Sequence, residues 1–145
     1  MSGSLNQSPP DTPDSTMLST ALVLIDRALG FATSHGLRIS AVVLDATFTP
    51  VALARVDGAF PSTVAVAIAK AHTALNFGGA THVLRERIVP ENQRALSAVE
   101  PKLMFVGGGA PITREGRVVG ALGISGGSED QDIQCAIHAC LEQPS

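Results

Sequence analysis

His72 is the histidine whose surroundings in the sequence are most suggestive of chemistry. It shares a spacing of three and four with apolar residues, so it is predicted to lie on the apolar face of a helix, with Lys70 well round the helix from it. A histidine in such a place is either a hydrogen-bonded core residue or a functional group. In the functional interpretation it binds a metal or haem iron, or acts as an acid or base tuned by partial burial. The residues of this face are Ala65, Ile68, His72 and Leu75.

Arg55 and Asp57 are a second pair of residues that could act together. They lie two apart at the end of a predicted strand, so their side chains point to the same side. They could pair with each other, or they could offer a guanidinium fork and a carboxylate to one ligand. A solvated ion pair at the end of a strand explains them equally well.

A cluster of glycines between residues 107 and 127 is the most concentrated feature of the chain. The stretch GGGAPITREGRVVGALGISGG combines a triple glycine, a turn at residues 114–116, a strand with two more glycines, and a Ser-Gly-Gly turn. Glycine weakens a strand, so its repetition indicates positive φ angles or the close approach of a ligand or a second backbone. We therefore expect a binding site around this hairpin.

The turn formed by residues 125–127 is unsuited to a polyphosphate. The chain lacks the Gly-Lys-Ser/Thr ending of a phosphate-binding loop, and acidic residues at the start of the next helix would repel a polyanion. A single carboxylate, such as an organic acid or a haem propionate, is still compatible with the amides of this turn. The acidic residues are Glu129, Asp130 and Asp132.

The hydrophobic pattern predicts the helices and strands that would position these residues. Their order is helix, two strands, helix, three strands and helix, with Ser62 as the cap of the second helix and a short helix plus loop over residues 81–101. Because hairpin connections dominate, we expect an α+β domain with a five-stranded, mainly antiparallel sheet and helices packed on it. Helices are predicted at residues 15–35, at 62–77 and from about 129, and strands at 38–45, 51–57, 103–106, 110–113 and 117–124.

Composition limits the class of protein and its partners. A chain of 145 residues that is 45% hydrophobic fits one soluble domain, over residues 15–145, after a polar arm, residues 1–14, that we expect to be disordered. A net charge of −3, scattered basic residues and the lack of Tyr and Trp argue against nucleic-acid binding. Without a secretory signal or a long apolar run, the protein is expected to be cytoplasmic, with no membrane partner and with Cys135 and Cys140 reduced.

Ordered motifs along the chain carry a family resemblance. They are VVLD (42–45), RVDGA (55–59), KAHTA (70–74), GGGAPI (107–112) and GALGISGG (120–127), followed by Gln131-Asp132. Together they resemble the GlcG-like haem-binding family, also called the haem-degrading domain family, over essentially all of the chain from residue 15 onward. The resemblance implies a profilin-like three-layer α/β/α domain, usually assembled into homo-oligomers. It also implies a relationship to the C-terminal domain of PduO-type cobalamin adenosyltransferases.

The resemblance also implies a ligand pocket. Its lining would be Arg55, Asp57, Lys70, Gly108, Gly109, Pro111 and Ser125. This chain departs from the family pattern at His72, where relatives commonly have Tyr or Phe, and at Phe48, where a turn glycine is usual. His72 could supply an iron ligand or a general base that relatives lack, whereas Phe48 bears only on the type of the first hairpin turn.

Three hypotheses about function follow. In the first, an oligomeric protein binds haem or a related tetrapyrrole, with His72 as axial ligand and Arg55 or Lys70 meeting the propionates. In the second, a catabolic lyase, isomerase or hydrolase acts on a small organic acid or an aromatic ring-cleavage product; Arg55 clamps a carboxylate, His72 or Asp57 moves a proton, and amides around residues 108–109 stabilise negative charge. In the third, the domain is an assembly module without a ligand.

Overall fold

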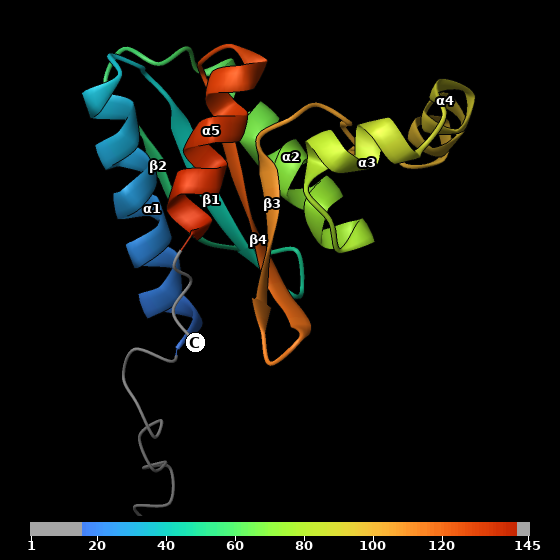
Figure 1. Ribbon diagram of the computed structural model, residues 1–145, viewed down its shortest axis with the longest axis horizontal. Helices are drawn as coiled ribbons and strands as arrows, with labels where there is room; N and C mark the ends of the chain where they lie inside the picture. Colours follow the sequence, from blue (N-terminus) through green and yellow to red (C-terminus); the bar gives the residue numbers. More distant parts are fainter. Residues whose placement is uncertain (1–15, 142–145) are drawn as a thin grey trace, which may run out of the picture.

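The computed structural model describes residues 16–141. The arm expected over residues 1–14 lies outside the described residues. Within them the chain forms five helices and four strands (Figure 1). The helices are α1 (Met17–Ser34), α2 (Ser62–Phe77), α3 (Thr81–Arg87), α4 (Pro90–Val99) and α5 (Glu129–Cys140), and the strands are β1 (Ser40–Asp45), β2 (Pro50–Arg55), β3 (Gly109–Arg114) and β4 (Arg117–Ser125).

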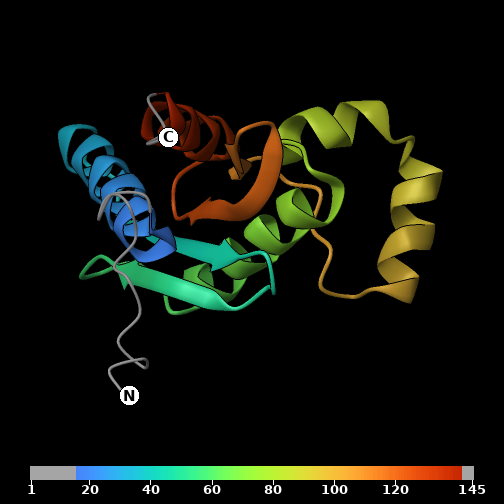
Figure 2. The same ribbon diagram turned by 90° about the horizontal axis from the view of Figure 1, so that it is seen from below.

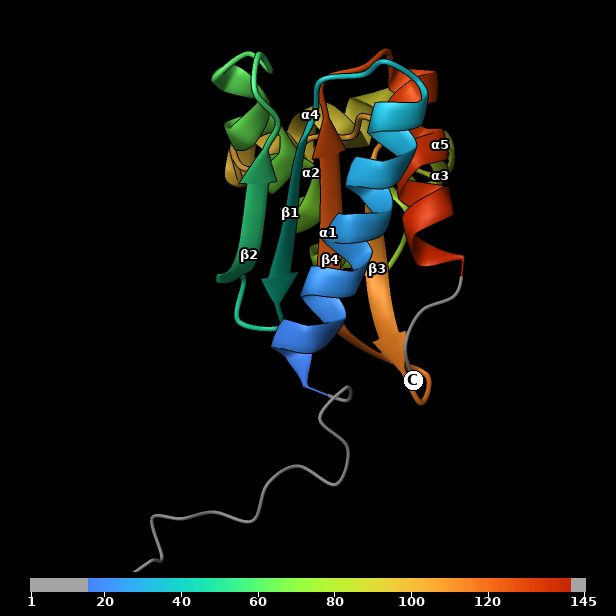
Figure 3. The ribbon, with the colours of Figure 1, turned by 90° about the vertical axis from the view of Figure 1, so that its left-hand side faces the viewer.

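The strands make one antiparallel sheet between two layers of helix, which confirms the α+β prediction. The strand order is β2-β1-β4-β3, and every neighbouring pair is antiparallel. Helices α1 and α5 lie on one face and α2 lies on the other (Figure 3). Alternating side chains of β1 serve both layers: Ala41 and Val43 join the core under α1 and α5, and Val42 and Leu44 join the core under α2.

The sheet has four strands rather than the five predicted. The strand expected at residues 103–106 is an extended segment without strand pairing. Leu103 and Phe105 are buried, as they would be in a strand, but the amide of Met104 donates to Thr73 Oγ1 of α2 at 2.7 Å. The side chains of this segment therefore alternate in burial as those of a strand do, but a side chain of α2, and not a neighbouring strand, accepts the backbone hydrogen bond.

The helix ends agree with the sequence in part. Thr16 caps α1 by accepting the amide of Ser19, and Gly36 follows the helix at φ +66°, as expected for a C-terminal glycine. Ser62 as the cap of α2 is wrong, because it is the first helical residue and the N-cap is Pro61, which has helical φ and ψ and no side-chain cap bond. The chain instead enters α2 through a tight turn in which the amide of Thr63 donates to Phe60 O at 2.9 Å.

The segment expected to hold one short helix and a loop holds two helices. α3 continues from the end of α2, and α4 turns away from it, so the pair projects from the body of the molecule (Figures 1 and 2). None of the residues of α4 is buried. The chain returns from α4 to the body through Glu100, Pro101 and Lys102, which brings Glu100 beside His72.

Helix α1 has the length and composition of a membrane span, with a mean hydropathy of 1.3 over its 18 residues. In this fold its apolar face packs against the sheet and α5. The buried residues of α1 are Thr20, Ala21, Leu24, Ile25, Ala28 and Ala32.

Candidate functional site

The buried face of α2 differs from the one predicted. Lys70 is only 2% exposed and lies on the face that packs on the sheet, whereas His72 lies on a half-buried flank. The prediction that Lys70 points away from the core is therefore wrong. The physical reason is the small size of the residues that touch the sheet: a Cβ at Gly123 of β4 would overlap the carbonyl oxygen of Ala67. Close packing selects alanine there and leaves the larger Ile68 and Leu75 on the flank, where they dominate the sequence pattern.

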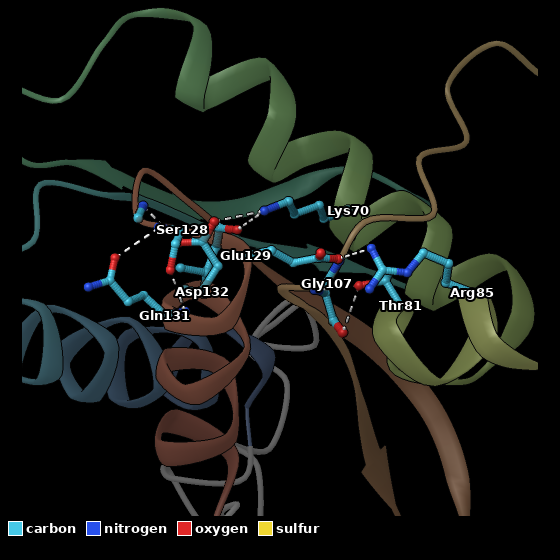
Figure 4. A network of polar contacts seen from close by, with 11 residues as sticks. Lys70, Thr81, Arg85, Gly107, Ser128, Glu129, Gln131 and Asp132 are labelled. Carbon is cyan, nitrogen blue, oxygen red and sulfur yellow. Dashed lines mark hydrogen bonds and ion pairs between the residues drawn. The ribbon is translucent and has the colours of Figure 1, made fainter.

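Lys70 joins α2 to α5 and β4 (Figure 4). Its Nζ donates to Asp132 Oδ2 and to Ile124 O, both at 2.9 Å, and both side chains of the ion pair are 3% exposed. Asp132 Oδ1 also accepts the amide of Gly127 at 2.9 Å. Burial raises the pKa of the Asp132 carboxyl, and the Lys70 ammonium opposes that rise. The amine predicted to meet a ligand is thus engaged inside the protein.

Glu129 makes a second link, one turn before Asp132 on α5. Its Oε2 accepts the amide of Gly107 at 2.8 Å and pairs with Arg85 of α3 (Figure 4). The Arg85 hydrogen bond, together with the Gly107 amide, lowers the pKa of the Glu129 carboxyl. The acidic start of α5 therefore binds the chain's own amides and the Arg85 cation, in addition to its favourable place at the helix N-terminus.

Gly108, Gly109 and Pro111 line an open apolar hollow between β3 and α5, with a volume of about 360 Å³. A Cβ at Gly109 would overlap the carbonyl oxygen of Lys70, so this glycine is required for packing, and its amide donates to Thr81 Oγ1 at 2.9 Å. The expected role of this amide in stabilising a ligand's negative charge therefore has a competitor within the protein. Further residues of the lining are Ala80, His82, Ile133, Ala136, Ile137 and Cys140.

Sequence reasoning missed the contribution of α3 and α5 to this hollow, which we call the α5 hollow. His82 of α3 lies half-buried at the edge of the lining. Ile133 and Ile137, one helical turn apart, were the available signal, because an apolar pair that continues to the open end of a helix can face a cavity. Cys135 and Cys140 are free thiols, as predicted; burial raises the pKa of Cys135 to about 12 and that of Cys140 to about 11.

His72 lies at a different hollow, on the outer side of α2. This α2 hollow has a volume of about 330 Å³ and is lined by Ala65, Ile68, Ala69, His72 and Lys102. The His72 side chain is 12% exposed, and its Nε2 lies 3.3 Å from Asn76 Nδ2 and 3.9 Å from Glu100 Oε1. Burial lowers the pKa of His72, which favours the neutral imidazole; Glu100 opposes this shift.

The remaining predicted site residues lie elsewhere. Arg55, at the end of β2, donates from Nη1 to Ala59 O at 3.1 Å, and Asp57 is exposed in the loop that follows. The two are not an ion pair. Ser125 is buried at the end of β4, where it pairs with Ser40 of β1. Among residues 16–141 no group of three or more His, Cys, Asp or Glu side chains could hold a metal ion.

The chain is similar to curated proteins that it matches over only part of their length. The chain is 37% identical over 98 residues to the corrinoid adenosyltransferase PduO of Citrobacter freundii, a match that covers 65% of this chain and 29% of that enzyme. A second curated relative is matched over 56% of its length, so the chain spans about half or less of these two proteins.

Solved structures share the fold over most of both chains. The structure of a PduOC–haem complex superposes with a TM-score of 0.77 at 30% identity, over 83% of this chain and 88% of the other. The structure of HbpS superposes with a TM-score of 0.78 at 29% identity, over 97% and 95% of the two chains. The family model for haem-degrading HbpS-like proteins matches residues 17–140. The family resemblance is therefore confirmed, and the chain belongs to the HbpS-like haem-degrading protein family.

Proposed function

We propose that this protein binds haem in the α2 hollow, with His72 as the axial ligand of the iron. The observation that carries the proposal is a largely buried histidine, whose pKa burial lowers, in an otherwise apolar lining. Haem chemistry in the family and the haem complex of the related PduOC support the choice of ligand. Bound haem would supply an iron centre with redox and ligand-binding chemistry.

The residues at the α2 hollow fit such a group in three respects. Neutral imidazole is the form that binds iron, and burial favours that form of His72. Ala65, Ile68 and Ala69 offer an apolar surface over which a flat macrocycle can lie. Lys102 places an ammonium at the rim, where a propionate would find a cation.

The contacts of the His72 ring favour ligation through a small local rearrangement. Asn76 is exposed and its amide contacts Nε2 at 3.3 Å, so releasing this nitrogen breaks one long hydrogen bond at the surface. Glu100 lies within 4 Å of the ring. Its Oε1 is 3.9 Å from the same Nε2, so this partly exposed carboxylate would turn aside when Nε2 binds the iron.

The volume of the hollow supports an oligomeric assembly. About 330 Å³ is at the lower end of the range for ligand pockets, and the lining comes almost entirely from one helix. One chain would therefore cover a single face of a macrocycle. A second copy covering the other face would exclude water from the iron, and we propose a homo-oligomer for that reason.

The catabolic-enzyme hypothesis receives less support. The lining of the α2 hollow includes neither Arg55 nor Asp57, which would clamp the substrate and move a proton. Arg55 also already donates to Ala59 O. General acid–base catalysis requires these groups within hydrogen-bonding reach of one substrate.

The test is a titration of the apo protein with haem, followed by visible absorption, for three proteins. The wild type should give a saturable Soret shift, and His72→Phe should lose it while keeping its thermal stability. His82→Phe is the matched control, because it removes a half-buried histidine from the α5 hollow and should bind as the wild type does. Loss of the shift in His82→Phe alone would move haem to the α5 hollow, and no shift in the wild type at micromolar haem would refute haem binding.

A further inference from the structure

Phe48 adopts a backbone conformation that disfavours bulky side chains. It lies in the loop between β1 and β2 at φ +63°, in the left-handed region. Among the described residues Glu115, at φ +52°, is the other residue besides glycine that does so, and it sits in an exposed turn directly before Gly116. A left-handed conformation at a bulky residue is a steric penalty that persists only where its surroundings enforce it.

The loop itself enforces this conformation. Asp45 Oδ1 accepts the amide and the hydroxyl of Thr47, at 2.8 and 2.6 Å, and the amide of Thr49 at 3.3 Å. The backbone closes around them, because the amide of Phe48 donates to Asp45 O and the amide of Asp45 donates to Thr49 O. Position 48 is thus fixed by polar contacts that involve only the backbone of Phe48. These contacts do not explain why residue 48 is a phenylalanine.

Core packing does not explain the phenylalanine either. Phe48 is 41% exposed, so it is not a buried residue of the core. Its contact is with His72: the two ring centroids lie 4.7 Å apart at an interplanar angle of 48°. The neighbours of the His72 imidazole therefore include the Phe48 ring and the Glu100 carboxylate. Aromatic pairs at such separations are attractive beyond the area they bury.

We infer that Phe48 is a positioning residue that holds the His72 ring and extends the α2 hollow with an aromatic wall for a planar ligand. The inference rests on the proposed function for the role of the wall, and on the apo protein alone for the hold on His72. These two roles, the hold on the His72 ring and the wall for the ligand, explain why a partly exposed aromatic residue occupies a strained loop. Phe48 would then contribute an aromatic contact with the macrocycle in a chain that has few aromatic residues and no Tyr or Trp.

The experiment compares Phe48→Gly with Phe48→Tyr and Glu115→Gly. Glycine at 48 relieves the backbone and removes the ring, and tyrosine keeps the ring. Glu115→Gly relieves a similar backbone conformation in a different turn, between β3 and β4. NMR of the apo proteins would follow the His72 ring protons, whose ring-current shift should vanish only in Phe48→Gly. The dissociation constant for haem should rise about two- to tenfold in that variant, the range for one aromatic contact, and stay unchanged in the other two.

Thermal unfolding completes the test. The melting temperature of Phe48→Gly should stay within about 3 °C of the wild type, because relief of strain offsets the lost contact. A fall of about 10 °C or more would show that Phe48 is a core residue and would overturn the inference. Unchanged His72 signals would overturn the hold on His72, whether or not the wild type binds haem. Haem binding that is lost with His72 but indifferent to Phe48 would overturn the wall and leave the proposed function standing.

Discussion

Replacing Lys70 with methionine should destabilise the protein strongly without weakening haem binding. Methionine keeps the length of the side chain but removes the ammonium that bonds Asp132 and Ile124 O at 2.9 Å. Asp132, with 3% of its side chain exposed, would then hold a buried charge without its cation. Breaking a buried pair in this way typically costs about 3–5 kcal/mol, or roughly 6–20 °C in melting temperature for a chain of this size.

A double-mutant cycle measured by chemical denaturation at pH 7 would separate the pair from its surroundings. Asp132→Asn keeps an oxygen for the amide of Gly127 and removes the negative charge. Each single variant should lose several kcal/mol, and the double variant should lose at least about 1.5 kcal/mol less than the sum of the two losses. Additive losses below about 1 kcal/mol each would refute the view that this pair secures α2 to α5.

The same variants discriminate between a structural and a ligand-binding Lys70. The Lys70 amine is buried and hydrogen-bonded to two groups of the protein, so it is not free to bind a ligand. The folded fraction of Lys70→Met should therefore bind haem with the affinity of the wild type. Unchanged stability together with weakened haem binding would return Lys70 to the role that the family resemblance implied for it.

Two further predictions concern packing and pH. Gly123→Ala should destabilise the protein by several kcal/mol in denaturant, because the new Cβ overlaps Ala67 O. Gly30→Ala, near the C-terminal end of α1 with open space at its Cβ, should instead be neutral or stabilising by up to about 1 kcal/mol. Equal effects of the two substitutions would contradict the close approach of α2 to the sheet. Glu129, whose pKa lies below its usual 4.5, contributes stability that is complete above pH 4.5 and lost as pH falls through the folded-state pKa. Glu129→Gln should therefore be less stable to heat than the wild type at pH 7, and this difference should shrink as the pH falls below 4.5; a pH-independent difference would show that the charge of Glu129 has no part.

The main elements of the fold were predictable from local signals. The 3–4 spacing of α1, the glycine at position 36 and the turn at residues 114–116 each report on a few neighbouring residues, and the structure follows them. The expected strand at 103–106 failed because side-chain alternation does not reveal which group bonds the backbone. That information depends on Thr73, 31 residues before Met104, and no local pattern contains it.

The candidate site was harder to predict than the fold. From the sequence, the larger apolar residues of α2 are expected to mark its buried face. In the structure, α2 approaches the sheet through alanines that pack against a glycine of β4, and Lys70 is buried among these alanines. Lys70 is buried because it pairs with Asp132 of α5. Its burial cannot be predicted without knowing that the start of α5 packs next to this part of α2. Phe48 was noted only for its turn, because its contact with His72 joins a loop to a helix from different parts of the chain.

Helix α4 has a consequence for the timescale of events at the α2 hollow. A ten-residue helix with no buried residue gains little from tertiary packing, and isolated helices of this length are marginal in water. Its amides should therefore exchange with solvent through local opening, far faster than those of the central strand β1. Since Glu100 and Lys102 follow α4 directly, each opening would withdraw the charged rim from His72 while the imidazole stays on the rigid α2. The position of the charged rim beside His72 would then fluctuate with the local opening of one short helix, independently of any motion of the sheet.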